Sequence, residues 1–363
     1  MLYHFLYPLR DLFFGFNVFK YITFRSVGSS VTAFLISAFL GKWLIKKLKA
    51  MNIGEHVRKK AAYASLYEHH KDKEGTPTMG GLLIVGAIVM AVFLWADLSN
   101  KYIWIVTIAT FWLGIFGFAD DYIKLTREKS RGLTAAVKLT GQLILGLGIG
   151  FILYYDANVG DRLDIPFFKN LVIHLGASYI FFSALVVVGA SNAVNLTDGL
   201  DGLAIGCVSI VAITYSGISY ITGHFTFSEY LHLIYIPQAG ELTVFCAAIF
   251  GAGLGFLWYN CHPADVFMGD TGALALGGAI ATVAIIIKKE LLLVLVGGIF
   301  VAEAISVIIQ VFSFRYRKKR VFLMAPLHHH FQLKGWAEAK IIFRFLIIAI
   351  ILALLSLSTL KLR

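Results

Sequence analysis

Charged side chains are scarce in this sequence, because Lys, Arg, Asp and Glu together make up only 15% of its 363 residues. A soluble domain carries about 25% charged and about 45–50% apolar residues, whereas 58% of this chain is hydrophobic. The mean hydropathy of +0.78 agrees with that excess. Surface-to-volume scaling leaves a soluble protein nowhere to bury so much apolar surface. The composition therefore excludes a soluble fold and predicts a membrane protein.

Cysteine is also rare, with only Cys207, Cys246 and Cys261 in the chain. Their spacing matches neither a zinc site nor a disulfide framework, so we interpret them as small buried hydrophobic residues. The sequence lacks a nucleic-acid-binding motif, internal repeats, low-complexity tracts and a separate polar domain. A single membrane domain over residues 1–363 is the simplest organisation.

Long apolar runs are what the sequence has instead. A transmembrane helix needs about 20 mainly apolar residues, and ten stretches fit that pattern. They cover residues 22–44, 78–97, 101–119, 134–154, 171–190, 201–221, 241–258, 271–288, 290–313 and 340–360. The aromatic-rich residues 1–20 predict an interfacial segment. The predicted fold class is an all-α polytopic membrane protein.

Basic residues predict the orientation, since Lys and Arg accumulate in cytoplasmic loops. With both termini on the outer, periplasmic side, the inner loops hold eighteen basic residues and the outer segments hold eight. The Lys288–Lys289 pair, on the outer side, is the one poor fit. The net charge of +11 is then explained by orientation and by attraction of anionic lipids or substrates. The inner loops are residues 45–77, 120–133, 191–200, 259–270 and 314–339.

Carboxylates gather in these inner loops. Asp120 and Asp121 are adjacent, so their like charges repel and a cation would relieve the repulsion. The alternative is a solvated helix end paired with Lys124. Asp270 stands at the start of the eighth predicted span, where it suits either an Mg²⁺ ligand or a helix N-cap. Basic residues alone predict the orientation, yet this orientation places all these carboxylates on one face.

The segment from Asn195 to Gly202 carries two Asp-Gly pairs between two apolar spans. If it is helical, Asn195, Asp198 and Asp201 fall within about 120° of one face. Such a face suits a cation, or a ribose and a base edge. Gly199 would let a backbone or ligand approach closely. The alternative is a turn whose polar side chains cap the next helix.

Three further segments lie beside the same predicted face. Phe267, in a polar loop, is suited either to stacking on a nucleobase or to anchoring at the interface. The Gly-rich residues 75–81 follow Lys73 and can hold phosphate through backbone amides, but they lack the Walker A pattern. The successive residues His328–His330 predict a loop cluster, a zinc site or a phosphate contact.

Charge inside the predicted spans is scarce, and ionisable residues there are functional candidates. Lys138 comes early in the fourth span, close to the carboxylates of the inner face. Glu303 is near the middle of the ninth span, and the sequence offers it no partner.

Several of these motifs together resemble one family, the bacterial phospho-N-acetylmuramoyl-pentapeptide transferases. They are members of the polyprenyl-phosphate N-acetylhexosamine-1-phosphate transferases. The resemblance extends over essentially the whole chain. The motifs that carry it are Asp120–Asp121, Asn195–Gly202, Phe267–Gly272 and Pro326–His330 with Gly335–Trp336, and the Thr76–Gly81 segment points to the muramoyl branch.

The resemblance implies a reaction and its site. UDP-N-acetylmuramoyl-pentapeptide gives its phospho-sugar to undecaprenyl phosphate, which yields lipid I for peptidoglycan and UMP. It also implies Mg²⁺ as cofactor, a homodimer, and an active site on the cytoplasmic face of the inner membrane. Asp270 is implied as the metal ligand and Asp120 as the candidate base. The other catalytic candidates are Asp121, Lys124, Lys138 and His328, and the implied substrate contacts are Lys73, Thr78, Asn195, Asp198, Gly199, Asp201, Asn260, Phe267, Gln310 and His329.

The sequence leaves alternatives open at two levels. A sister transferase using another UDP-amino sugar, a transporter or channel, and a structural membrane scaffold all share an apolar helical chain. If the chain is such a transferase, two mechanisms are open. The lipid phosphate attacks the donor directly, or a covalent phospho-aspartyl intermediate forms on Asp120 or Asp121. A phosphate monoester has its second pKa near 6 and is mostly dianionic at pH 7, so a base would contribute less than the usual factor of about 10²–10⁴.

Overall fold

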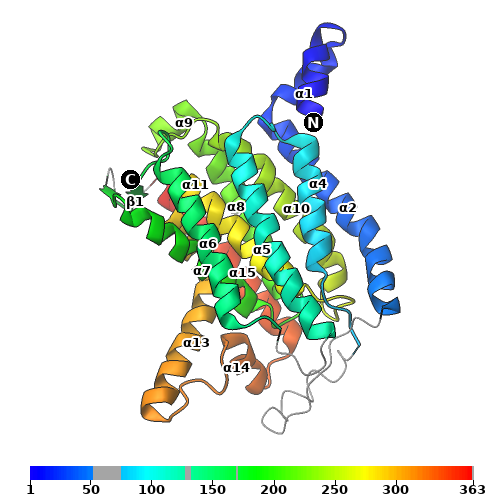
Figure 1. Cartoon of the computed structure of the whole chain (residues 1–363), viewed down its shortest axis with the longest axis vertical. Helices are drawn as coiled ribbons and strands as arrows, with labels where there is room; N and C mark the ends of the chain where they lie inside the picture. Colours follow the sequence, from blue (N-terminus) through cyan, green and yellow to red (C-terminus); the bar gives the residue numbers. More distant parts are fainter. Residues whose placement is uncertain (52–74, 127–131, 169–170, 362–363) are drawn as a thin grey trace.

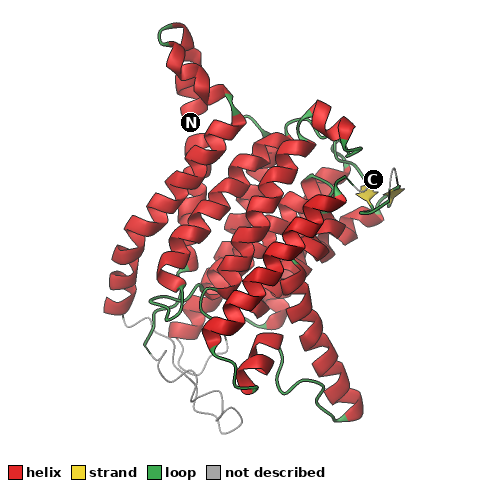
Figure 2. Cartoon of the chain, turned by 180° about the vertical axis from the view of Figure 1, so that it is seen from behind, coloured by secondary structure: helices red, strands yellow, loops and turns green. Residues whose placement is uncertain are grey.

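A computed structural model describes residues 1–51, 75–126, 132–168 and 171–361 of the chain (Figure 1). These residues form a helical bundle with one small two-stranded sheet (Figure 2). The first half contains α1 (Leu2–Leu6), η1 (Tyr7–Asp11), η2 (Phe14–Lys20), α2 (Ile22–Ala50), α4 (Gly81–Trp95), α5 (Lys101–Thr126), α6 (Ala135–Tyr154), β1 (Arg162–Asp164) and β2 (Val172–His174). The second half contains α7 (Ser178–Thr197), α8 (Leu203–Thr222), α9 (Phe225–Tyr230), η5 (Ala239–Glu241), α10 (Leu242–Asn260), α11 (Gly269–Ile286), α12 (Glu290–Val296), α13 (Gly298–Arg317), α14 (Leu327–Leu333) and α15 (Glu338–Thr359).

Among the described residues, nine helices are long and apolar enough to cross a membrane. The predicted span 78–97 corresponds to α4, which has only 15 residues. Even so, α4 connects the two ends of the bundle. Its first residue, Gly81, lies against Gly272 at the start of α11, and its last residue, Trp95, lies against Gly28 near the start of α2. The all-α polytopic prediction is confirmed, with α4 as a short additional crossing.

Helix α11 is the centre of the bundle, since 89% of its apolar window is buried. Its sequence is rich in Gly and Ala, and small residues let neighbouring helix backbones approach closely. A Cβ on Gly277 would lie 2.7 Å from the Ala190 carbonyl oxygen of α7. Helices α5, α7, α4 and α8 all contact α11. The first residue of α11 is therefore held in a fixed place relative to its neighbours.

The predicted span 290–313 is wrong as a single helix. The chain forms α12 up to Val296 and begins α13 at Gly298, with Gly297 between them. Glycine weakens a helix interior, which explains the break at a Gly-Gly pair. Helix α13, orange in Figure 1, leaves the bundle at an angle. Its exposed side chains include Ile308, Val311 and Phe312, which suits contact with lipid.

The predicted span 171–190 is also corrected. Residues Val172–His174 form β2, which pairs antiparallel with β1, and α7 begins only at Ser178. The β1–β2 hairpin explains the poorly fitting lysine pair. The Lys288 ammonium donates to the Gly160 carbonyl at 2.7 Å, and Lys289 pairs with Asp164 of β1. Both lysines are buried, so they stabilise contacts inside the protein and do not report its orientation in the membrane.

The two termini lie toward one end of the bundle, whereas α14 and the ends of α5 and α2 lie toward the other (Figure 1). This arrangement requires an even number of crossings, which the nine long helices and α4 together supply. The α1, η1 and η2 segment projects from the terminal end, beyond the start of α2.

Candidate active site

Helices α5 and α11 meet where the carboxylates lie. A Cβ on Gly117 of α5 would lie only 2.3 Å from the Asp270 carbonyl oxygen, so the two backbones touch. This contact brings Asp120 and Asp121, in the last turns of α5, beside Asp270 in the first turn of α11. We call these three residues the carboxylate cluster. Asp120 and Asp121 belong to a helix that continues to Thr126, rather than to a loop.

Asp121 binds the start of α11. Its carboxylate accepts hydrogen bonds from the backbone amides of Asp270 at 3.2 Å and Thr271 at 3.0 Å, and from the Thr271 hydroxyl at 2.7 Å. The first amides of a helix have no partner within the helix, and a carboxylate is well suited to accept from them. Asp121 therefore fixes the position of Asp270, and Thr271 takes part in a way that the sequence did not indicate.

Two lysines bridge the other two carboxylates. The Lys124 Nζ lies 2.6 Å from Asp120 and 3.2 Å from Asp270, and the Lys138 Nζ lies 2.7 Å and 2.5 Å from the same two oxygens. Asp120 also accepts from the Leu133 amide at 2.7 Å. The five predicted residues Asp120, Asp121, Asp270, Lys124 and Lys138 thus form one charged group at one end of the bundle.

The donor set of the cluster fits a magnesium ion. One oxygen of each of the three aspartates lies within 4.8 Å of the others, and Mg²⁺ prefers carboxylate oxygens together with phosphate oxygens. Two ammonium groups already bridge Asp120 and Asp270, so a positive charge is well placed between these two carboxylates.

The helical interpretation of residues 195–202 is wrong, because α7 ends at Thr197 and Asp198 is its C-cap. The turn that follows is held by Asn260, whose side chain accepts from the Gly202 amide at 3.0 Å and donates to the Val266 carbonyl at 2.8 Å. Gly202 has a φ of +77°, a left-handed conformation that favours glycine. Asn195 and Asp198 lie at the end of α7 beside this turn.

Asp201 is buried within the same turn and joins it to two other segments. It accepts from the Ala264 amide at 3.2 Å and lies 3.1 Å from His262 Nδ1, while its own amide donates to Glu338 of α15 at 3.2 Å. No local sequence pattern indicated the contacts that His262 and Glu338 make.

Phe267 and Thr78 lie in two paired segments. The Phe267 amide donates to the Pro77 carbonyl at 2.8 Å, and the amides of Gly80 and Gly81 donate to the carbonyls of Phe267 and Met268. These two glycine amides are therefore engaged, contrary to the expectation that they hold phosphate. A Cβ on Gly269 would lie 3.1 Å from Thr78 Oγ1, so Thr78 lies beside the carboxylate cluster.

The predicted His cluster is divided between different contacts. His328 is buried beneath the 195–202 turn, and a Cβ on Gly199 would lie 2.2 Å from its Nε2. The His329 Nδ1 lies 2.8 Å from Gln332 Oε1.

Gln310 holds the backbone of residues 321–322 through three hydrogen bonds. Lys73 lies outside the described residues.

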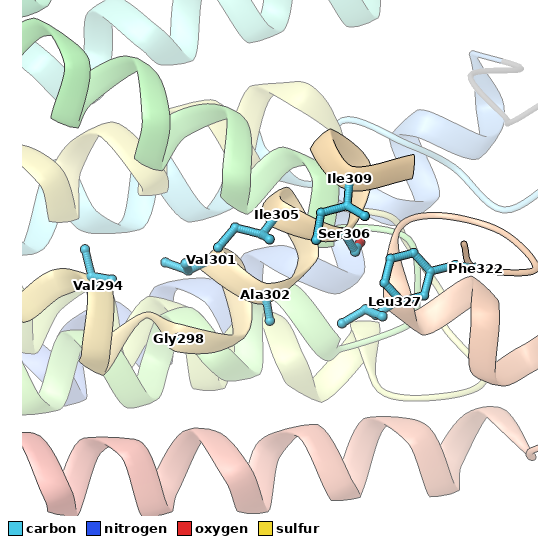
Figure 3. Close-up of a pocket in the computed structure, with 9 residues that line it drawn as sticks. All are labelled: Val294, Gly298, Val301, Ala302, Ile305, Ser306, Ile309, Phe322 and Leu327. Carbon is cyan, nitrogen blue, oxygen red and sulfur yellow. The ribbon is translucent and has the colours of Figure 1, made fainter. Parts of the chain in front are cut away.

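An apolar groove of about 380 Å³ lies along α12 and α13, and one end of it is lined by Phe322 and Leu327 (Figure 3). Among the described residues that line it, Ser306 has the only polar side chain. Figure 3 shows Phe322 and Leu327 at one end of the groove and Val294 at the other. Its lining residues are Val294, Gly298, Val301, Ala302, Ile305, Ser306, Ile309, Phe322 and Leu327.

Comparison with known proteins assigns the chain to a family. Residues 103–288 match the family described as Glycosyl transferase family 4, and residues 73–85 match the phospho-N-acetylmuramoyl-pentapeptide-transferase signature 1. The phospho-N-acetylmuramoyl-pentapeptide-transferase of Desulfatibacillum aliphaticivorans is 54% identical over 100% of both chains. The chain belongs to the phospho-N-acetylmuramoyl-pentapeptide-transferase family. Relatives of the same name from Citrifermentans bemidjiense and Syntrophus aciditrophicus are 53% and 52% identical, again over 100% of both chains.

Family membership confirms the resemblance that the motifs indicated. The matched range 103–288 contains the whole carboxylate cluster and the 195–202 turn, and the signature range 73–85 contains Thr78. The transferase family signature therefore lies on the segment that pairs with the Phe267 loop, directly beside the carboxylates.

The contact between Gly199 and His328 yields a first prediction. We expect Gly199→Ala to lower the free energy of unfolding by about 1–3 kcal/mol, because the new methyl group would overlap a buried ring and force both segments apart. The matched control is Gly189→Ala on α7, where a Cβ meets no other atom within 4 Å. Thermal unfolding of both variants in detergent checks this. Equal stability of the two variants would contradict the close contact.

Proposed function

We propose that the chain transfers phospho-N-acetylmuramoyl-pentapeptide from its UDP donor to undecaprenyl phosphate, releasing UMP and forming lipid I. The observation that carries the proposal is the convergence of three aspartates and two lysines at one end of a membrane bundle. Its support comes also from full-length relatives whose names state the transfer of phospho-N-acetylmuramoyl-pentapeptide. Phosphoryl transfer between two anions needs positive charge held in place where they meet.

The lysines supply that charge in the proposed reaction. Lys124 and Lys138 each contact both Asp120 and Asp270, so they are held where phosphate oxygens of the donor would arrive. Mg²⁺, held by Asp270 with Asp120 and Asp121 in reach, would neutralise the diphosphate and stabilise the departing UMP. Asp121 acts indirectly, since it orders the first turn of α11 and so the direction of the Asp270 carboxylate.

Asp120 and Asp121 differ in their availability for covalent chemistry. Both oxygens of Asp121 accept hydrogen bonds from the start of α11, so a phospho-aspartyl intermediate would fall on Asp120. Incubation with the UDP donor alone tests the covalent route. Release of UMP without lipid, with the phospho-sugar trapped on Asp120, would favour it, and failure to trap any adduct would favour direct attack.

The apolar groove suits the acceptor of the proposed reaction. A polyprenyl chain has no polar groups along its length, and the groove presents apolar side chains from α13, a helix largely exposed outside the bundle. The end of the groove at Leu327 adjoins His328, which lies beneath the 195–202 turn. The groove would thus lead a lipid tail away from the polar end of the bundle.

We also propose that the site faces the cytoplasm and that the membrane is the bacterial inner membrane. The basic-residue count and the position of both termini opposite the site support this orientation.

Cys261 allows a test in the native chain, because it is exposed beside the site while Cys207 and Cys246 are buried. A membrane-impermeant maleimide should label inside-out vesicles and leave intact spheroplasts unlabelled. Labelling of spheroplasts would reverse the orientation. The homodimer remains a proposal drawn from the family resemblance.

Donor choice tests the proposed function against its sister reaction. Purified protein receives undecaprenyl phosphate, Mg²⁺ and either UDP-N-acetylmuramoyl-pentapeptide or UDP-N-acetylglucosamine, and UMP release is measured. We expect release only with the muramoyl donor. Robust turnover of UDP-N-acetylglucosamine would overturn the substrate assignment while leaving the reaction class in place.

A further inference from the structure

Glu303 and His328 form a buried pair beside the 195–202 turn. Each side chain is only 1% exposed, and Glu303 Oε1 lies 3.2 Å from His328 Nδ1. The same carboxylate accepts from the backbone amides of Leu327 at 2.6 Å and His328 at 3.2 Å. Burying a carboxylate is costly unless it is paired and hydrogen-bonded, and here one carboxylate accepts from two backbone amides and lies against an imidazole nitrogen. The pair therefore joins α13 to α14 at a defined geometry.

Neither ring nitrogen makes a hydrogen bond to a described residue, although Nδ1 lies 3.2 Å from the Glu303 carboxylate. His328 Nε2 is buried and has no hydrogen-bond partner among the residues that the structure describes. It faces Gly199, where the missing side chain leaves just enough room for the ring. Buried polar atoms in folded proteins are nearly always hydrogen-bonded, so an orphaned one calls for an explanation. The turn it faces is the one that carries Asp198 and Asp201.

The contacts of Glu303 determine which nitrogen is presented to that turn. A carboxylate accepts hydrogen bonds, so the nitrogen beside it carries the hydrogen. Because Nδ1 lies 3.2 Å from Glu303, a hydrogen on Nδ1 would pair with that carboxylate, and rotating the ring would break this contact and turn Nε2 away from Gly199. A carboxylate that orients a functional imidazole in this way fixes both its tautomer and its direction.

We infer that Glu303 is a positioning residue, which holds the His328 ring so that Nε2 faces the sugar-nucleotide donor at the 195–202 turn. The inference rests on the proposed function for the identity of that donor. It gives Glu303, an ionisable residue within the membrane region, a role that the sequence alone did not reveal. Glu303 acts through His328 and need not touch either substrate.

The kinetic test combines Glu303→Gln, His328→Ala and the double variant in the UMP-release assay. We expect Glu303→Gln to lower kcat about tenfold or more, with the KM of each substrate changed less than about threefold. In the His328→Ala background the same substitution should have no further effect, because residues that act as a unit are not additive. Losses that multiply, or a change confined to KM, would overturn the inference. Ser313→Ala is the control, since Ser313 is buried on α13 and its hydroxyl donates to the Lys319 carbonyl at 2.9 Å.

A spectroscopic experiment tests the positioning role of Glu303 without measuring enzyme turnover. In ¹⁵N-histidine-labelled protein, the His328 ring signals are assigned by their disappearance in His328→Ala. We expect Nδ1 to carry a hydrogen in the wild type and the ring signals to shift in Glu303→Gln, with a melting temperature close to that of Ser313→Ala. A bare Nδ1, or ring signals unchanged in Glu303→Gln, would refute the positioning role. If the wild type released no UMP but the His328 ring signals behaved as expected, the result would count against the proposed function alone.

Discussion

Replacing Asp270 by Asn is expected to lower UMP release by about 10²–10³-fold, the range seen when one preorganised electrostatic group is removed from a transfer site. Asp270 is contacted by both lysines of the cluster and is the predicted metal ligand. The variant loses the negative charge that would hold a cation against the donor diphosphate. Turnover should therefore also become less responsive to added Mg²⁺, which is measured by titrating the metal in the UMP-release assay.

Asp265→Asn provides the matched control for this prediction. Asp265 lies in the same loop, only five positions before Asp270, and its side chain is exposed. We expect this variant to keep turnover within about threefold of the wild type. If Asp270→Asn retained wild-type turnover and an unchanged Mg²⁺ response, the assignment of Asp270 as the metal ligand would be wrong.

The two adjacent aspartates should respond differently to the same substitution. Asp121→Asn is expected to lower the free energy of unfolding by about 2–3 kcal/mol, because an amide nitrogen would replace an acceptor of the buried α11 donors. Asp120→Asn keeps an acceptor for the Leu133 amide, so we expect less than about 1 kcal/mol of destabilisation together with a loss of turnover. Thermal unfolding and UMP release, measured on both variants, separate the two roles.

Thr271→Val is the control for the thermal-unfolding measurements on Asp121→Asn and Asp120→Asn. It removes only the hydroxyl that donates to Asp121 at 2.7 Å and should destabilise by less than Asp121→Asn. A destabilisation by Asp120→Asn as large as that of Asp121→Asn would mean that both carboxylates hold the fold. Asp121 would then have no special part in placing α11.

Much of the fold follows from hydropathy, because apolar length alone decides what can cross lipid. The sequence predicts every long helix approximately, yet it merges α12 with α13 and begins α7 too early. Those errors share a cause. Gly297 and the β1–β2 hairpin interrupt apolar stretches whose mean hydropathy stays high, and a composition window averages over a single-residue break.

The candidate site is predicted in part for a similar reason. Asp120, Asp121 and Asp270 are conspicuous because carboxylates are rare beside apolar spans, and the structure brings them together. The partners of Glu303 and Asp201 lie far away in the sequence, at His328 and Glu338. Such pairings depend on how helices pack, and no local pattern records them. The helical interpretation of 195–202 failed because the two Asp-Gly pairs end the helix rather than continue it.

The most direct test of the account reconstitutes the chain in liposomes that contain undecaprenyl phosphate. With UDP-N-acetylmuramoyl-pentapeptide and Mg²⁺ outside, lipid-linked product, UMP and solute flux are measured in the same sample. The account predicts one UMP for each lipid-linked product, a requirement for both lipid and Mg²⁺, and no flux. Absence of product across several lipids and UDP-sugars, with solute flux that survives Asp270→Ala, would contradict it and identify a transporter.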